Sequence, residues 1–202
     1  MELAHRWHDR NLARMELVIA LLILGLLVGV FSRYTLRVFA HAERSMMNST
    51  VISINTALNY RASMAVMMGK YDELEFLLKM NPMEDMQTIP EVNHFNNEIN
   101  NYVFELASDI ISPPSNYGGN LASYDPDLME KGKWYYQQDE GLIVYTISNS
   151  EFFESNIDGL ARIRFRIKFD YKDNNANGQY DKGVDEFNFV KLQAIDSYTW
   201  DL

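Results

Sequence analysis

The sequence predicts an α+β fold in which one long N-terminal helix packs on an antiparallel β-sheet of about four strands. Three observations support this prediction. An apolar run near the N-terminus is followed by apolar residues at helical spacing, and no proline occurs between Met1 and Pro82. After a loop-like stretch at 115–127, the hydrophobic period changes from helical to alternating. With 202 residues, the chain has room for one anchor and one head domain.

The apolar run Met15–Phe31 predicts a membrane-spanning helix. It is seventeen residues long with one charge, Glu16, and at 1.5 Å per residue it covers about 25 Å, enough for a bilayer core. A signal peptide is the alternative, but its apolar core usually has only about 7–15 residues, and Phe31–Tyr34 lacks a small-residue cleavage site. We therefore expect an uncleaved anchor: residues 1–14 form an N-terminal segment, 15–38 the transmembrane helix and 39–202 the head.

Charges near the span leave two questions open. Equal numbers of arginines flank it, so the positive-inside rule does not set the orientation. These arginines are Arg6, Arg10 and Arg14 before the span, and Arg33, Arg37 and Arg44 after it. Glu16, at the edge of the span, costs a few kcal/mol unless it reaches the headgroups or finds a partner. Headgroup contact and pairing with another membrane helix are equally compatible with the residues alone.

Beyond the span, the pattern predicts that the helix continues with one apolar face. Polar residues such as Ser49, Asn55, Asn59 and Arg61 occupy the other faces. A second helix is predicted over 71–80, with Gly69 marking the break. The apolar stripe consists of Met47, Val51, Ile54, Leu58, Ala62, Ala65 and Met68.

The head domain is predicted to contain one more helix and then the sheet. Helical spacing over 90–111 ends at two prolines, and 115–127 is expected to be a loop. Aromatic and β-branched runs predict strands around a turn at 139–141. Further strands are expected at 162–169 and 187–194, the last with a phase slip that indicates a bulge.

The charge and the amino-acid composition argue against some classes of function. The net charge is −10, and the acidic surplus lies beyond residue 44, which argues against nucleic-acid binding. One face of the 162–169 strand is cationic, with three arginines and a lysine. An anion site is one interpretation, but we favour a solvated face paired with nearby acidic residues. There is no cysteine, hence no basis for a disulfide or a Cys-based zinc site.

Residues 173–181 contain the front half of a calcium loop. Oxygen-bearing side chains occupy loop positions 1, 3, 5 and 9, with Gly178 at position 6, and the closing acid is displaced to position 13. We therefore expect a structural Ca²⁺ that pins the long connection between two strands, with an Asx-rich turn as the alternative. The predicted ligands are Asp173, Asn175, Asn177, Gln179 (through its carbonyl), Asp181 and Asp185.

No catalytic residue is predicted. The four histidines are scattered, and the sequence contains no nucleophile elbow, phosphate loop, HExxH or dinucleotide fingerprint. We expect a protein that is not an enzyme and has no small-molecule substrate.

The segment Met15–Gly25 resembles the N-terminal helix of type IV pilins and type II secretion pseudopilins. In that family an apolar helix carries one glutamate near its start, continues amphipathically and packs on an antiparallel sheet. The runs Gly132–Tyr136 and Gly141–Tyr145 are similar to a hairpin in many such heads. The resemblance implies a pilin-like fold and a single-pass protein of the bacterial inner membrane. Its N-terminus would be cytoplasmic and its head periplasmic, and its partners would be pilin or pseudopilin subunits and inner-membrane pilus assembly proteins.

The start of the chain departs from this family. Counted back from Glu16, a processed N-terminus would be Leu12, but Asn11 stands where precursors carry glycine, and Arg14 interrupts the apolar stretch. An unprocessed assembly factor is therefore favoured over a fibre subunit, which would be found in the pilus. The alternative function is a membrane-tethered, calcium-dependent periplasmic binding module unrelated to pili.

Overall fold

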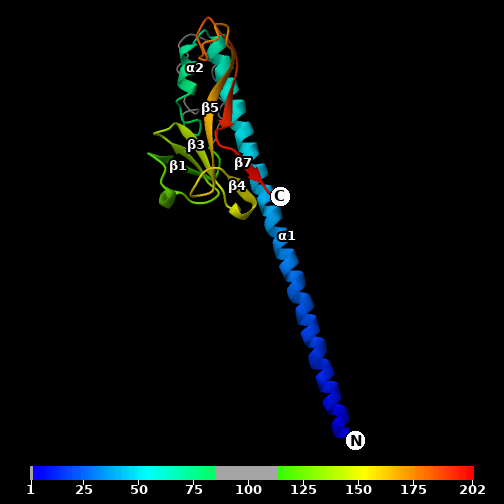
Figure 1. Ribbon diagram of the computed structural model, residues 1–202. Helices are drawn as coiled ribbons and strands as arrows, with labels where there is room; N and C mark the ends of the chain where they lie inside the picture. Colours follow the sequence, from blue (N-terminus) through cyan, green and yellow to red (C-terminus); the bar gives the residue numbers. More distant parts are fainter. Residues whose placement is uncertain (1, 85–112) are drawn as a thin grey trace, which may run out of the picture. The chain divides into compact units, whose positions relative to one another are not determined.

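A continuous helix, α1 (Glu2–Met67), begins the chain in the computed structural model, which describes residues 2–84 and 113–202 (Figure 1). The chain forms two compact units, residues 1–42 with Leu202 and residues 43–201, and α1 contributes to both. The helix ends in a Schellman motif: Lys70 N–H donates to Ala65 O at 2.8 Å and Gly69 N–H to Val66 O at 3.0 Å. Gly69 has φ +69°, a conformation that favours glycine, so the predicted break at this residue is confirmed.

After this break, a short helix, α2 (Asp72–Leu77), lies within the range predicted for a second helix. The helix expected over 90–111 falls outside the described residues. The main strands are β2 (Trp134–Gln137), β3 (Leu142–Thr146), β5 (Arg162–Lys172) and β6 (Glu186–Ala194). These four correspond to the predicted runs and pair antiparallel in that order.

The sheet differs from the prediction in two ways. A fifth strand, β1 (Tyr117–Leu121), pairs parallel with β2, so the order is β1-β2-β3-β5-β6 and the sheet is mixed. Its sequence contains two glycines and an asparagine, which have low strand propensity, and tertiary pairing overrides that preference. A separate antiparallel pair joins β4 (Phe153–Ser155) to β7 (Tyr198–Trp200), each too short for a sequence pattern. Two short 3₁₀ helices, η2 (Pro126–Leu128) and η3 (Ser150–Phe152), complete the described elements.

The predicted bulge in β6 is present. Asp170 pairs with Phe189, but the next rung pairs Tyr171 with Phe187, which leaves Asn188 as the extra residue. The extra residue returns Val190, which is fully buried, to the same face as Phe187.

The core of the 43–201 unit lies between one face of the sheet and the second half of α1 (Figure 1). From α1 the predicted stripe supplies five buried residues, so that prediction is confirmed: Met47, Ile54, Leu58, Ala62 and Ala65. The largest fully buried side chain of the sheet is Trp134, whose ring lies 4.8 Å from that of Tyr145.

A smaller core covers the opposite face of the sheet at β2 and β3. There, Tyr135, Leu142 and Val144 pack with Met129, which follows η2. This second core leaves the β5–β6 part of the same face for polar residues.

Candidate functional site

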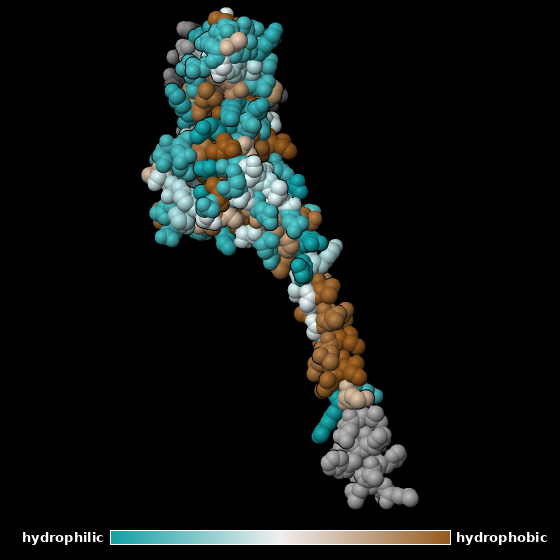
Figure 2. Space-filling model, viewed as in Figure 1, coloured by the Kyte–Doolittle hydropathy of each residue, from teal (hydrophilic) through white to brown (hydrophobic). Residues whose placement is uncertain are grey.

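The first part of α1 presents apolar side chains to its surroundings. Among the described residues, α1 is the helix long and apolar enough to cross a membrane. Its side chains are exposed all round the helix, as Leu22 (69%) and Phe31 (70%) illustrate, and Figure 2 shows this stretch as a brown segment. Such a surface is stable in hydrocarbon and not in water, which is consistent with single-pass membrane anchoring. Glu16 is exposed at the start of this segment and available to a partner.

Glu43, with 4% of its surface exposed, is the buried carboxylate among the described residues of the head. Its Oε1 accepts hydrogen bonds from Ser148 N–H at 2.6 Å and Tyr145 Oη at 3.1 Å. Its Oε2 accepts from Asn149 N–H at 2.9 Å and from Asn149 Nδ2 at 2.7 Å. These four donors are neutral and lie at the end of β3 and in the turn before η3. Glu43 thus fixes the position of α1 against this turn, and the hydrogen bonds offset the desolvation of its charge.

Tyr145 shares the burial of this carboxylate. Burial, and then the negative charge and hydrogen bond of Glu43, raise the pKa of the Tyr145 phenol well above its usual value of 10.0. The phenol is therefore protonated at neutral pH and is the donor in its hydrogen bond to Glu43.

Two asparagines of α1 bind the edge of the sheet. Asn59 pairs with the peptide group of Val190: its Nδ2 donates to Val190 O at 2.7 Å, and its Oδ1 accepts from Val190 N–H at 2.9 Å. Asn55 Oδ1 accepts from Leu192 N–H at 2.6 Å. Four residues of helix rise about 6.0 Å and two residues of strand about 6.8 Å, so the i, i+4 pair matches alternate residues of β6. The helix side chains thus substitute for a neighbouring strand along part of an otherwise open edge.

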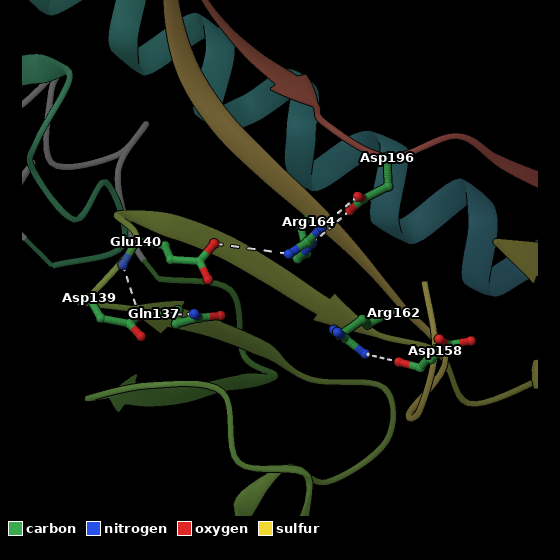
Figure 3. A network of polar contacts seen from close by, with 7 residues as sticks. All are labelled: Gln137, Asp139, Glu140, Asp158, Arg162, Arg164 and Asp196. Atoms are coloured by element: carbon green, nitrogen blue, oxygen red, sulfur yellow. Dashed lines mark hydrogen bonds and ion pairs between the residues drawn. The ribbon is translucent and has the colours of Figure 1, made fainter. Parts of the chain in front are cut away.

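The cationic face of β5 is partly neutralised within the head. Arg164 forms a two-point ion pair with Asp196, at 2.8 and 2.7 Å, with Glu140 at 3.9 Å (Figure 3). Arg162, 6% exposed, lies over the Tyr124 ring and donates to carbonyl oxygens, among them Asp158 O at 3.0 Å. The hydrogen bond from Arg164 lowers the pKa of Asp196 below its usual value. The expected pairing with a nearby acidic side chain is confirmed for Arg164, whereas Arg162 is buried and is paired with Tyr124 and backbone carbonyls instead.

The connection between β5 and β6 contains the candidate metal ligands. Asn175 Nδ2 and Asn177 Nδ2 both approach Asp181 Oδ2, at 2.6 Å each. Asp173 accepts from the backbone N–H of Asn177 at 3.3 Å and of Gly178 at 2.7 Å. In this arrangement the amide oxygens of Asn175 and Asn177 accept from backbone N–H groups, and rotation of each amide about its last bond would turn the oxygens that Ca²⁺ prefers toward Asp181. Within the described residues, no three His, Cys, Asp or Glu side chains form a metal-ligand group.

The other two predicted ligands have different surroundings. Asp185 Oδ1 accepts from Asn174 N–H at 2.9 Å and its Oδ2 from Asp181 N–H at 2.7 Å, so this carboxylate braces the loop. Gln179 donates its backbone N–H to Asn177 Oδ1 at 2.7 Å, and the role of its carbonyl stays a prediction. Below the loop, the Tyr180 ring packs edge-on against Phe169, with ring centres 5.4 Å apart. The loop is therefore held to the sheet by an aromatic contact as well as by its own hydrogen bonds.

Sequence reasoning missed the contacts of Glu43, Asn55 and Asn59. A signal for Glu43 existed, because extending the apolar stripe back from Met47 by one helical turn lands on this residue. For Asn55 and Asn59, the i, i+4 spacing was visible, but nothing local identified their partner strand, more than 130 residues away.

Comparisons of the chain with protein-family models, with curated proteins and with solved structures found no match. The resemblance to type IV pilins and pseudopilins therefore stays a prediction based on the chain's own residues.

Proposed function

We propose that the protein is a non-enzymatic inner-membrane component of type IV pilus biogenesis, of the MSHA kind. It acts as an assembly factor or a minor pilin-like subunit through packing of its helix in the membrane. The observation that carries this proposal is the two-part character of α1. An apolar segment with one acidic residue, Glu16, continues without a break into a segment that packs on the head's sheet.

Residues before the span favour the assembly-factor form of the proposal. Asn11 and Leu12 do not match a prepilin cleavage site, and Arg14 is exposed beside the apolar surface. A non-standard leader together with Glu16 most resembles MshF, an MSHA-pilus biogenesis protein. The chain would then keep its N-terminal segment and remain in the membrane.

Glu16 is the residue that this function uses. A carboxylate at the edge of a bilayer is stabilised by a cation on a neighbouring helix. We infer that Glu16 accepts the free amine of a processed pilin subunit that packs beside α1. The head, in the periplasm, then lies next to that subunit's head.

Co-expression with a prepilin peptidase, followed by intact mass measurement, tests processing. The expected result is an unchanged mass, and loss of the first eleven residues would contradict the assembly-factor form.

Photo-crosslinking from position 23 in the span of the full-length chain tests the pairing. The wild type and the control variant Ser32→Ala should both capture pilin subunits or inner-membrane assembly proteins. The Glu16→Gln variant should capture neither. Capture of neither class would contradict the proposal as a whole.

We also propose that the loop 173–185 holds a structural Ca²⁺ through Asp173, Asn175, Asn177 and Asp181. The closeness of Asn175, Asn177 and Asp181 favours this, because with both amides turned over, two amide oxygens and one carboxylate oxygen would converge on one point, as Ca²⁺ coordination requires. A bound ion would have a structural role only, because it would cross-link the loop.

The melting temperature of the full chain should differ by several degrees between Ca²⁺ and chelator. The shift should vanish in the variant D173A/D181A and persist in the control D127A/D139A. No shift in the wild type would refute the site.

The alternative function is a calcium-dependent binding module unrelated to pili. The photo-crosslinking and the thermal melts together distinguish it from the proposed function. A clear calcium effect combined with no capture of pilus proteins would favour the module.

A further inference from the structure

The outer face of β5–β6 carries a cationic surface that is distinct from the loop and from Glu43. Side chains alternate along a strand, so three cross-strand rungs share this face. They are Arg166 with Gln193, Lys168 with Lys191, and Asp170 with Phe189. Arg166 and Lys168 are exposed, and Phe189 is 43% exposed at the end of the row. We call these residues the β5–β6 surface.

The cations of this surface differ from the other two on β5. Arg162 and Arg164 are engaged within the head, whereas Arg166 and Lys168 show no ion pair or hydrogen bond among the described residues. Lys191 forms an ion pair with Asp170 at 3.3 Å, so the two uncompensated charges of the row are those of Arg166 and Lys168. Lys168 and Lys191 stand directly opposite each other, an arrangement that weakens strand pairing. Asp170 offsets this repulsion only at Lys191, so the charges of Arg166 and Lys168 are available to a negatively charged partner.

The remainder of the head has the opposite charge. Residues 43–201 contain 13 Lys and Arg and 25 Asp and Glu, a formal charge of −12. Exposed carboxylates that form no ion pair in the described part of the chain include Glu151, Glu154 and Asp158. One chain therefore carries both the cationic β5–β6 surface and an acidic region formed by Glu151, Glu154 and Asp158, which we call its acidic surface.

We propose that the β5–β6 surface binds the acidic surface of the head of a second copy of this chain. Two cationic surfaces repel each other, so the contact is heterologous: the β5–β6 surface of one copy meets a different surface of the next. Copies anchored in one membrane are held at high local concentration with the same orientation, which makes weak side-by-side contacts effective. Phe189 adds apolar area at the rim of the contact. Such a contact can repeat, and it gives rows or rings of heads.

Photo-crosslinking of the full-length chain reconstituted in lipid vesicles, measured as the ratio of oligomer to monomer on a gel, tests this at about 0.05 M and about 0.5 M NaCl, where screening differs strongly. The wild type should associate at low salt and be largely monomeric at high salt. The charge reversal R166E/K168E should weaken association at low salt by about tenfold or more. The control K79E/K131E changes the net charge by the same amount on exposed lysines elsewhere, and it should change association by less than about threefold.

A mixing experiment tests the heterologous geometry. R166E/K168E keeps its acidic surface, so it should still bind to the wild type and limit the assemblies to small species, although it does not bind to itself. The milder R166Q/K168Q variant should show an intermediate loss, and near-UV circular dichroism checks that each variant is folded. A wild type that stays monomeric at low salt would overturn the proposal. Equal weakening by K79E/K131E, or no weakening by R166E/K168E, would overturn it as well.

Discussion

Residues 15–38 of α1 expose apolar side chains around nearly the whole helix, whereas residues 43–67 bury one stripe and expose mainly serine, threonine and asparagine. Both stretches are helical without proline, so the backbone alone does not distinguish them. The first depends on its surroundings for stability, because none of its apolar surface is covered within its own unit. The second is stabilised by the head, through Leu58 in the core and through polar contacts from Glu43, Asn55 and Asn59. The side-chain pattern thus divides one helix into an exposed apolar stretch, long enough to span a membrane, and a structural element of a folded domain.

The largest expected contrast between the two stretches comes from one substitution made in each. Leu58→Ala removes a fully buried side chain and should lower the free energy of unfolding of the head by about 2–5 kcal/mol. Leu24→Ala, in the exposed apolar stretch, should leave that free energy unchanged within about 0.5 kcal/mol. Denaturant unfolding in detergent, followed by tryptophan fluorescence, measures both, since Trp134 is buried in the core. Similar effects of the two substitutions would contradict the division.

Glu43→Ala tests whether a buried carboxylate positions the helix against the head. The substitution leaves the N–H groups of Ser148 and Asn149 without an acceptor, and it should cost about 2–3 kcal/mol. The exposed Glu154→Ala serves as control and should cost less than about 0.5 kcal/mol. If both substitutions had equally small effects, the network would not stabilise the head.

Asn59→Ala should cost about 1–2 kcal/mol, because it leaves the N–H and C=O of Val190 unpaired. Hydrogen exchange gives the more specific readout. Exchange of the Val190 amide should accelerate in Asn59→Ala, and exchange of the Leu192 amide should accelerate in Asn55→Ala. Asn48→Ala, an exposed asparagine on the same helix, is the matched control. If the protection of both amides against exchange were unchanged, the asparagines would not be the partners that protect these N–H groups of β6.

The smallest expected effect is the contribution of Asp196 to the pH dependence of the head's stability. Asp196 has a lowered pKa in the folded head, chiefly from its hydrogen bond with Arg164, so its ionised form stabilises the fold. That stability is fully present above about pH 4, the ordinary pKa range of a free aspartate, and is lost as the pH falls through the folded pKa. Asp196→Asn should therefore lower the melting temperature at pH 7 and flatten its decline in acid. Asp127→Asn, on the exposed η2, should leave the acid decline as it is in the wild type.

The sequence predicted the elements whose patterns are strong and local. The apolar N-terminal helix, the buried stripe of α1, four strands and the β6 bulge all follow from the pattern of apolar residues, and the structure contains them. It did not predict β1, whose glycines indicate a loop, or the three-residue strands β4 and β7. The same limit applies to the contacts of the helix. Whether Asn59 is a solvated residue or a partner of Val190 depends on where a strand lies after folding, and no local pattern contains that information.

The helix contacts of Glu43, Asn55 and Asn59 also restrict how this chain can change in length. One residue inserted between Glu43 and Asn55 would rotate every later position by about 100° relative to Glu43, so the carboxylate and the two amides could no longer all reach their partners. The stretch 43–59 should therefore tolerate substitution at its exposed positions but neither insertion nor deletion. The apolar stretch before it faces no such restriction, because added residues only lengthen or tilt a span. The division within α1 thus predicts where relatives of this protein differ in length: before Glu43, and not between it and Asn59.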